Sequence, residues 1–179
     1  MYADNTLTPK EAIRLCALGI LTAGPMPYGE LAGEVRHFIS RIQGPSLEMM
    51  GTSIELLKYE ALVETSEEGK ADDDALLTIT EKGQAELHTL LTTNIRAAAT
   101  EMNKLIIALK FRFLHLLDGD EQKTQVDHLI EVCENEITRL DDLRQHHGSR
   151  TGFLPSWLDH DISQLESNMI WLKSFHKNL

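Results

Sequence analysis

The stretch Leu77-Thr78-Ile79-Thr80-Glu81-Lys82-Gly83-Gln84-Ala85-Glu86-Leu87 (LTITEKGQAEL) passes from a strand pattern directly into a helix pattern. Leu77 and Ile79 alternate with threonines, which is typical of a strand with one buried face. Thr80 is suited to cap the helix that follows, and Glu81 lies in its first turn, where a carboxylate is favoured by the helix dipole. The sequence therefore predicts that a strand ends and a helix begins at Thr80.

A second strand pattern precedes this junction at Leu62-Val63-Glu64-Thr65, so the two strands are predicted to form a hairpin with a long loop. Three helical patterns precede the hairpin, at about residues 8–23, 28–42 and 46–61, with Thr8 and Ser46 as caps. The loop of the hairpin is strongly acidic: it carries Glu67, Glu68, Asp72, Asp73 and Asp74 against a single Lys70.

From Glu81 onward no proline occurs until Pro155, and the apolar spacing predicts one helical pattern as far as Leu117. A turn at 118–120, a heptad-spaced helix, a loop at 147–152 and a last helix follow. The heptad positions are Val126, Ile130, Cys133, Ile137 and Leu140. Three helices and a hairpin, followed by three longer helices, make up the predicted chain.

The composition excludes several classes of protein. The chain of 179 residues is 42% hydrophobic and 25% charged, as in a globular protein, and it has no apolar run long enough to span a bilayer and no secretory signal. Cys16 and Cys133 form no paired motif, which favours a reducing, cytoplasmic location. The net charge of −11 argues against an unspecific nucleic-acid binder but leaves a specific one open.

No catalytic or cofactor motif is present, so we expect neither an enzyme nor a cofactor. His146, His147 and Asp142 lie close in sequence, but adjacent histidines on a helix point apart and zinc needs three or four convergent ligands. We therefore expect no metal site.

The order helix, helix, helix, hairpin is that of a winged helix-turn-helix, and four motifs resemble the PadR-like family of transcriptional regulators. Leu18-Gly19-Ile20-Leu21, with Gly24-Pro25-Met26 and Gly29-Glu30-Leu31, resembles the family's opening motif. Ile54, Leu57, Leu62 and Val63 resemble the end of its recognition helix, and LTITEKGQAEL resembles its strand-to-helix junction. The segment 166–172 resembles the last helix of members with an extended C-terminal domain.

Two departures from the family pattern concern the DNA-binding part. Pro27-Tyr28-Gly29 replaces the family's histidine-containing segment, and Met49-Met50-Gly51-Thr52-Ser53-Ile54 replaces the usual aromatic start of the recognition helix. The resemblance implies a mainly α fold, with a winged helix-turn-helix domain at residues 1–83 and a C-terminal antiparallel helical, coiled-coil dimerisation domain at residues 84–179.

The resemblance implies a homodimeric DNA-binding regulator. We expect it to act as a repressor that binds a palindromic double-stranded operator. Polar residues of the third helix read base edges, and lysines and arginines neutralise phosphates. The predicted DNA contacts are Arg36, His37, Arg41, Ser46, Thr52, Ser53, Lys58 and Lys70, with Lys10 or Arg14 as further phosphate contacts. A different interpretation is that Arg36 and Arg41 pair with Glu30 or Glu34 on a solvated face.

The C-terminal helices carry apolar stripes that need a partner surface, either within the chain or on a second copy. The predicted dimer interface is Leu105, Leu109, Ile130, Ile137, Leu165, Met169 and Leu172. Some family members bind flat aromatic ligands, and a small aromatic effector would here be bound by Met102, Phe113, Trp171 and Phe175, which are otherwise packing residues.

The acidic hairpin supports an alternative function, a winged-helix protein-interaction module that does not bind DNA. A tip with this charge is repelled by the negative minor groove. Either Lys70 alone contacts a phosphate or the wing stays away from DNA.

Overall fold

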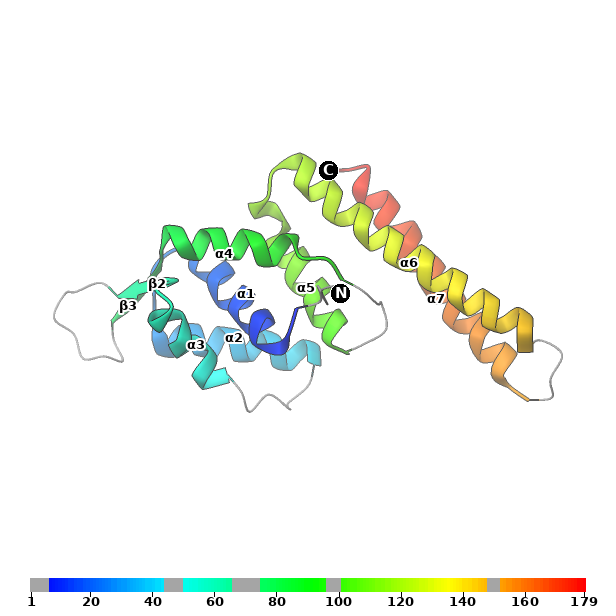
Figure 1. Cartoon of the computed structure of the whole chain (residues 1–179), viewed down its shortest axis with the longest axis horizontal. Coiled ribbons are helices and arrows are strands. Elements are labelled where there is room, and N and C mark those ends of the chain that lie inside the picture. The colour runs from blue at the N-terminus through cyan, green and yellow to red at the C-terminus, as the bar shows by residue number, and fades with distance from the viewer. Residues whose placement is uncertain (1–6, 44–49, 66–74, 96–100, 148–151) are drawn as a thin grey trace, which may run out of the picture. The chain divides into compact units, whose positions relative to one another are not determined.

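A computed structural model describes residues 7–43, 50–65, 75–95, 101–147 and 152–179 (Figure 1). The elements follow the order α1, β1, α2, α3, β2, β3, α4, α5, η2, α6, α7. Their bounds are α1 Pro9–Leu21, β1 Met26–Pro27, α2 Tyr28–Gln43, α3 Met50–Tyr59, β2 Val63–Thr65, β3 Leu76–Ile79, α4 Glu81–Thr92, α5 Glu101–Phe113, η2 Leu114–Leu116, α6 Gly119–His147 and α7 Leu154–His176. The chain is mainly α, as the sequence predicts.

The chain forms two compact units. The first comprises residues 1–93 and 99–117, and the second comprises residues 94–98 and 118–179. The sequence predicts a domain boundary after Gly83, but α4 packs on α1, and α5 packs on α1 and α2, so the first unit continues beyond that residue. We call the first part the winged unit. We call the second part the hairpin unit, after the helical hairpin that α6 and α7 form; the β2–β3 hairpin belongs to the winged unit.

Helix α1 is the centre of the winged unit and packs against α2, α3, α4, α5 and β3 (Figure 1). Its N-terminus is fixed by a capping box, in which the Thr8 hydroxyl accepts from Glu11 N and the Glu11 carboxylate accepts from Thr8 N. Nearly every residue from Ala12 to Leu21 is buried; Arg14 is the partly exposed exception. An apolar helix of this kind can be stable only when it is surrounded by other elements.

The predicted hairpin is the core of a three-stranded antiparallel sheet in the order β1-β3-β2. Val63 pairs with Ile79 on one side of the sheet, and Met26 pairs with Leu77 on the other. The sequence predicts β2 and β3 but not β1, because Pro27 was interpreted only as a helix breaker. A proline has no N–H to donate, but it is tolerated in an edge strand.

The junction at Thr80 is confirmed, and it also holds the end of α3. The Thr80 hydroxyl accepts from Gly83 N at 3.0 Å and lies 2.9 Å from the Ala61 carbonyl oxygen. Ala61 has a φ of 56°, the left-handed conformation with which the chain leaves α3. A Cβ atom at Gly83 would lie 2.1 Å from the Leu62 carbonyl oxygen. Only glycine therefore allows α4 to start this close to the α3–β2 turn.

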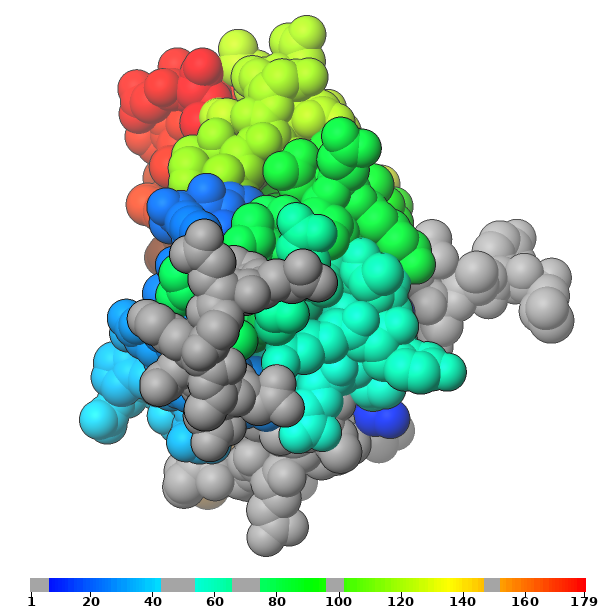
Figure 2. All heavy atoms as spheres, turned by 90° about the vertical axis from the view of Figure 1, so that its left-hand side faces the viewer, coloured from blue at the N-terminus to red at the C-terminus, as the bar shows by residue number. Residues whose placement is uncertain are grey.

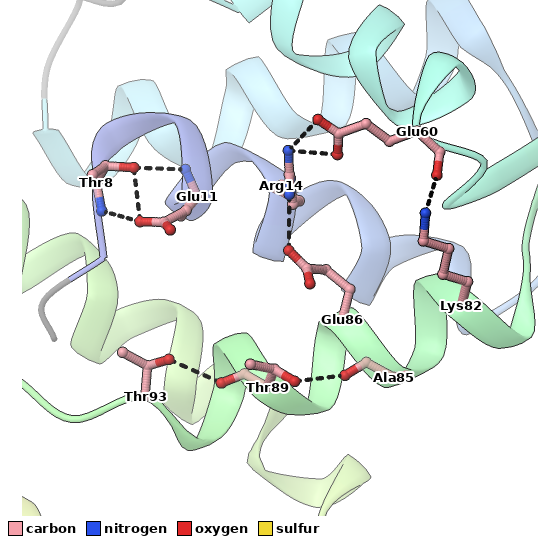
Figure 3. Close-up of polar contacts among 9 residues, drawn as sticks. All are labelled: Thr8, Glu11, Arg14, Glu60, Lys82, Ala85, Glu86, Thr89 and Thr93. Carbon is pink, nitrogen blue, oxygen red and sulfur yellow. Dashed lines mark hydrogen bonds and ion pairs between the residues drawn. The ribbon is translucent and has the colours of Figure 1, made fainter.

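The prediction of one helical pattern from Glu81 to Leu117 is wrong, since α4 ends at Thr92 and α5 begins at Glu101. Threonine hydroxyls bond back to carbonyl groups at this end, as in the bonds from Thr89 to Ala85 O and from Thr93 to Thr89 O (Figure 3). Such side-chain bonds compete with the helix ladder, and β-branched residues have a low helix propensity. Thr93 already has extended backbone angles.

A buried lysine donates to a backbone carbonyl group at this end of α4. The side chain of Lys110 in α5 is 2% exposed, and its ammonium group donates to the Leu91 carbonyl oxygen. Burial lowers the pKa of Lys110 to about 8. A cation at a helix C-terminus is favourable for the helix dipole, and this partly offsets the cost of its burial.

The hairpin unit consists of α6 and α7, which run antiparallel. Arg144 near the end of α6 forms an ion pair with Asp159 near the start of α7. At the other end the Lys173 ammonium lies 2.9 Å from Glu134 Oε1. Between them a small core forms from Leu140, Leu158 and Ile162, with Ile137 and Leu165 packed against it.

Candidate nucleic-acid interface

Helices α2 and α3 with the sheet give the winged unit the layout of a winged helix-turn-helix. Figure 2 shows a face of this unit to which α2 (light blue), α3 with the strands (teal) and α4 (green) all contribute. In such folds α3 is the helix that enters the major groove, and α2 crosses the phosphate backbone. The predicted contacts can now be placed on these elements.

Helix α2 carries Arg36, His37 and Arg41, and all three are exposed. Among the residues that the structure describes, neither arginine forms an ion pair with Glu30 or Glu34. Their guanidinium groups are therefore not neutralised by the acidic residues of the same helix. Of the predicted phosphate contacts in the described residues, these two arginines are exposed, and so is Lys10 at the start of α1.

Helix α3 carries several of the other predicted contacts. Thr52 and Ser53 lie in its first two turns, but their side chains, and all of Ser46 and Lys70, fall outside the described residues. Lys58 is half-buried, and its ammonium lies 5.8 Å from the centre of the Tyr28 ring. This is a distance at which a cation is attracted to an aromatic face.

Arg14, the further candidate for a phosphate contact, is occupied by two carboxylates (Figure 3). Its guanidinium lies 2.7 Å from Glu60 Oε2 and 2.8 Å from Glu86 Oε1. Burial alone would lower the pKa of Arg14, but the hydrogen bonds and charges of Glu86 and Glu60 outweigh it and raise that pKa. Lys82 adds a 2.8 Å bond to the Glu60 carbonyl oxygen. Arg14 thus joins α1, the end of α3 and α4.

Helix α3 has two exposed apolar side chains that were not predicted from the sequence motifs. Tyr59 is 89% exposed and Leu56 is 39% exposed, whereas Ile54 and Leu57 are buried. The signal was available in the sequence, because a stripe at Ile54, Leu57 and Ala61 turns Tyr59 away from the core at helical spacing. Tyr59 is a residue able to contact a sugar, a phosphate or a protein from the outer face of α3.

The four predicted effector residues are divided between the two units. Met102 and Phe113 lie in the winged unit, where Phe113 is 5% exposed and fills the space above Gly19. Trp171 and Phe175 lie in the hairpin unit and stack with their ring centres 5.6 Å apart. A separate cavity of about 270 Å³ in the winged unit is lined by Thr22, Gln84, Leu87, His88, Leu91, Leu116 and Leu117.

The residues predicted for the dimer interface are also divided. Leu105 and Leu109 are fully buried on α5, which packs on α1 and α2, so this chain already covers them. Ile130, Ile137, Leu165 and Met169 are half-buried in the hairpin unit, and Leu172 is buried there. The apolar residues that remain most exposed in that unit are Phe153, Leu154, Trp157, Ile170 and Trp171.

The described residues show no arrangement typical of catalysis. Burial raises the pKa of the Cys16 thiol to about 12, so the thiol is protonated and unreactive at neutral pH. In the described ranges no three histidine, cysteine or acidic side chains gather closely enough to hold a metal ion. None of the helices described has the length and apolar composition needed to cross a membrane.

Comparisons with solved structures find proteins that match most of this chain at low identity. Solved structures with a similar chain course include Bacillus subtilis PadR in complex with operator DNA, at 15% identity over 92% of this chain and 97% of that chain, with a TM-score of 0.39. Another is the same protein in complex with p-coumaric acid, at 14% identity over 96% and 97%, with a TM-score of 0.38. A third is a PadR-like transcriptional regulator from Bacillus cereus, at 16% identity over 93% and 96%, with a TM-score of 0.38.

No protein of curated function matches the chain. The family model described as "Putative AphA-like transcriptional regulator" matches residues 2–176, which is nearly the whole sequence. This match confirms the prediction, made from the motifs, of a PadR-like transcriptional regulator. The chain belongs to the AphA-like family of transcriptional regulators.

Proposed function

We propose that this regulator is a homodimeric repressor that binds a palindromic DNA operator through α2 and α3. The observation that carries the proposal is the pair of exposed arginines, Arg36 and Arg41, on the helix that precedes the reading helix. Counterion release by such residues supplies most of the affinity for DNA, and a dimer doubles their number. The two-fold symmetry of a dimer would match the symmetry of the operator.

Because the net charge of the chain is −11, DNA binding depends on whether these arginines gather on one face. The hairpin unit from Asp118 onward has 12 acidic residues and 6 basic ones, so it carries −6 of the total. A cytoplasmic DNA-binding protein with this balance must bind through a small basic surface, so the slope of its log affinity against log salt should correspond to a small number of phosphate contacts.

The test is a fluorescence titration of the chain against the DNA upstream of its own gene at several salt concentrations. Arg41→Ala should weaken binding about tenfold and lower the slope of log affinity against log salt by about two, because a dimer loses two phosphate contacts. Arg36→Ala should act in the same direction. The matched control is Arg139→Ala, which removes an exposed arginine of α6 and should change neither quantity.

The proposal fails if the unchanged protein binds unrelated DNA of the same length equally well at every salt concentration. It also fails if the control variant weakens binding as much as Arg41→Ala does. In that case the loss would reflect the net charge of the chain and not a contact made by α2.

A protein-interaction module is a second candidate function, and Tyr59 and Leu56 favour it because they place exposed apolar side chains on the reading helix. Tyr59→Ser separates the two functions. It should abolish capture of a protein partner if the face is a protein site, but it should leave salt-dependent DNA binding within a few fold.

The acidic loop gives a second criterion, because replacing Asp72, Asp73 and Asp74 with Ser should tighten DNA binding if the wing lies near the duplex.

The response to a small aromatic effector also remains a proposal. Bacillus subtilis PadR has been solved with p-coumaric acid, and an aromatic molecule of that class is the first to test on this chain. Release of bound operator DNA by millimolar effector would support the proposal, and unchanged binding would oppose it.

A further inference from the structure

Helix α7 has one apolar face, which its partner α6 covers, and a second face on which aromatic residues flank polar ones. Leu158, Ile162 and Leu172 are buried, and Leu165 is half-buried. Together with the half-buried Met169, these residues recur at intervals of three and four, as in a coiled-coil seam. They explain why α7 packs on α6, but they do not explain the aromatic residues on the remaining surface of α7.

The second face of α7 is palindromic. It starts at the residue before the helix and consists of Phe153, Trp157, His160, Gln164, Asn168, Trp171 and Phe175. Counted from Gln164, the aromatic residues lie seven and eleven positions away in both directions, and the polar residues lie four away in both directions. At about 100° per residue, all seven positions share a stripe less than roughly 90° wide.

This face is exposed in the chain. Phe153, Trp157 and Trp171 are 90%, 54% and 53% exposed, and Gln164 is exposed at the centre, where its amide lies 2.8 Å from His160 Nε2. The exposed parts of the three aromatic side chains amount to roughly 450 Å². That is about half of the roughly 800 Å² that each partner contributes to an interface of standard size.

We propose that a second copy of this chain packs on this face, with the two α7 helices antiparallel and Gln164 at the two-fold axis. A symmetric dimer needs a surface that is complementary to itself under a two-fold rotation. An antiparallel pair centred on Gln164 brings Trp157 against Trp171 of the second copy and Phe153 against its Phe175. A register shifted by one heptad would place a tryptophan against a polar residue instead.

The polar centre fits the same arrangement. A polar residue at one position of a helix seam can specify the register of the pair. In the proposed pair the two Gln164 amides meet each other, and each amide has a donor and an acceptor to exchange. No acidic residue of one helix lies opposite an acidic residue of the other: Asp161 faces the level of Ser167, and Glu166 faces that of Ile162.

The inference rests on the proposed homodimer and adds its register. The test uses variants of the full chain that each carry one added cysteine, under mild oxidation, followed by electrophoresis without reductant. Gln164→Cys should give a covalent dimer in most of the protein, because residues at a two-fold axis come within the roughly 7 Å between Cα atoms that a disulfide allows. Trp157→Cys and Trp171→Cys should each fail alone, since each residue lies about 21 Å along the helix from its own copy.

Mixing the Trp157→Cys and Trp171→Cys proteins should produce a covalent dimer that neither forms alone. The matched control is Glu166→Cys, an exposed position nearly on the opposite side of α7, which should not cross-link. Cys16 and Cys133 are buried in every variant, and the unchanged chain gives their background.

A dimer in light scattering that cross-links at Trp157→Cys alone, or at Glu166→Cys, would overturn the register but leave the homodimer standing. A monomer in light scattering would overturn both. DNA binding is measured separately by the titration above, so a failure of the repressor proposal does not resemble either result.

Discussion

The winged unit and the hairpin unit differ in how completely they bury their apolar side chains. In the winged unit α1 is surrounded, and Leu15, Leu18 and Ile13 are at most 1% exposed. In the hairpin unit α6 and α7 pack on each other, and both tryptophans of the chain remain more than half exposed. A pair of helices buries one stripe on each, so a second stripe needs another surface. The difference supports the proposal that the hairpin unit packs on a second copy, whereas the core of the winged unit around α1 is covered by its own chain.

The location of the tryptophans makes this difference measurable. Trp157 and Trp171 both lie in α7, so tryptophan fluorescence reports on the hairpin unit alone. Far-UV circular dichroism reports on the helices of both units. Two unfolding transitions that respond to different substitutions are expected, and each substitution below tests whether the units are separate.

The largest effect is expected for Gly83→Ala. Its methyl group would lie 2.1 Å from the Leu62 carbonyl oxygen and 2.8 Å from Ile79 Cγ1, so backbone must move. We expect the winged unit to lose more than about 3 kcal/mol of unfolding free energy in urea, measured by circular dichroism. The fluorescence transition should stay in place.

The matched control for this substitution is Gly33→Ala, in a helix where nothing lies within 4 Å of the added atom. It should stabilise α2 by about 0.5 to 1 kcal/mol, because alanine favours helix over glycine. If Gly83→Ala shifted the fluorescence transition as far as the circular dichroism transition, the two units would unfold as one.

Gly83 also shows how much of the fold the sequence predicts. The strand-to-helix junction follows from Thr80, Glu81 and the alternation before them, because these signals are local and the structure keeps them. The break after Thr92 was not predicted, because the apolar spacing continues through Ile95 while the termination depends on threonine hydroxyls and on Lys110 from another helix. The contact from Lys110 joins residues far apart in sequence and leaves no periodic signal, and the local threonine bonds do not alter the apolar spacing.

The sequence likewise predicts the position of some residues of the candidate site and not of others. Arg36, His37 and Arg41 are exposed on α2, as helical spacing predicts. The half-buried position of Lys58 beside Tyr28, and the burial of Leu105 and Leu109 by α1 and α2, depend on how elements pack and could not be read from one helix at a time. The second face of α7 can be derived from the sequence, because the seven-residue spacing of Trp157, Gln164 and Trp171 places them on one side of a helix.

The next effect concerns the core of the hairpin unit. Leu158 is fully buried between α6 and α7, and Leu158→Ala should cost about 2 to 3 kcal/mol, measured by the fluorescence transition in urea. In the unchanged chain this transition should move to higher denaturant as protein concentration rises, because a dimer is stabilised by mass action. The circular dichroism change of the winged unit should be independent of concentration.

Leu109→Ala is the control for Leu158→Ala, since it removes an equally buried leucine from the winged unit. It should shift the circular dichroism transition and leave the concentration dependence of fluorescence intact. A fluorescence transition that is the same at every protein concentration would mean that the hairpin unit is as self-sufficient as the winged unit.

The smallest effect concerns pH and the buried Lys110. Its pKa is lowered to about 8 in the folded chain, against 10.5 for an ordinary lysine, and burial is the cause. Between these two pH values the unfolded chain binds more protons than the folded chain, so stability must rise with pH. The rise attributable to Lys110 is about 2 kcal/mol from pH 8 to pH 10, and below pH 8 it vanishes because both states are protonated.

Urea unfolding followed by circular dichroism at pH 8, 9 and 10 measures this rise. It should be lost in Lys110→Met and kept in Lys104→Met, which removes an exposed lysine from the same helix. Because Lys110 lies in the winged unit, the fluorescence transition should show no difference between the two variants at any of these pH values. If both variants kept the rise, the ammonium of Lys110 would be solvated, and the winged unit would be less tightly closed around α5 than its buried side chains indicate.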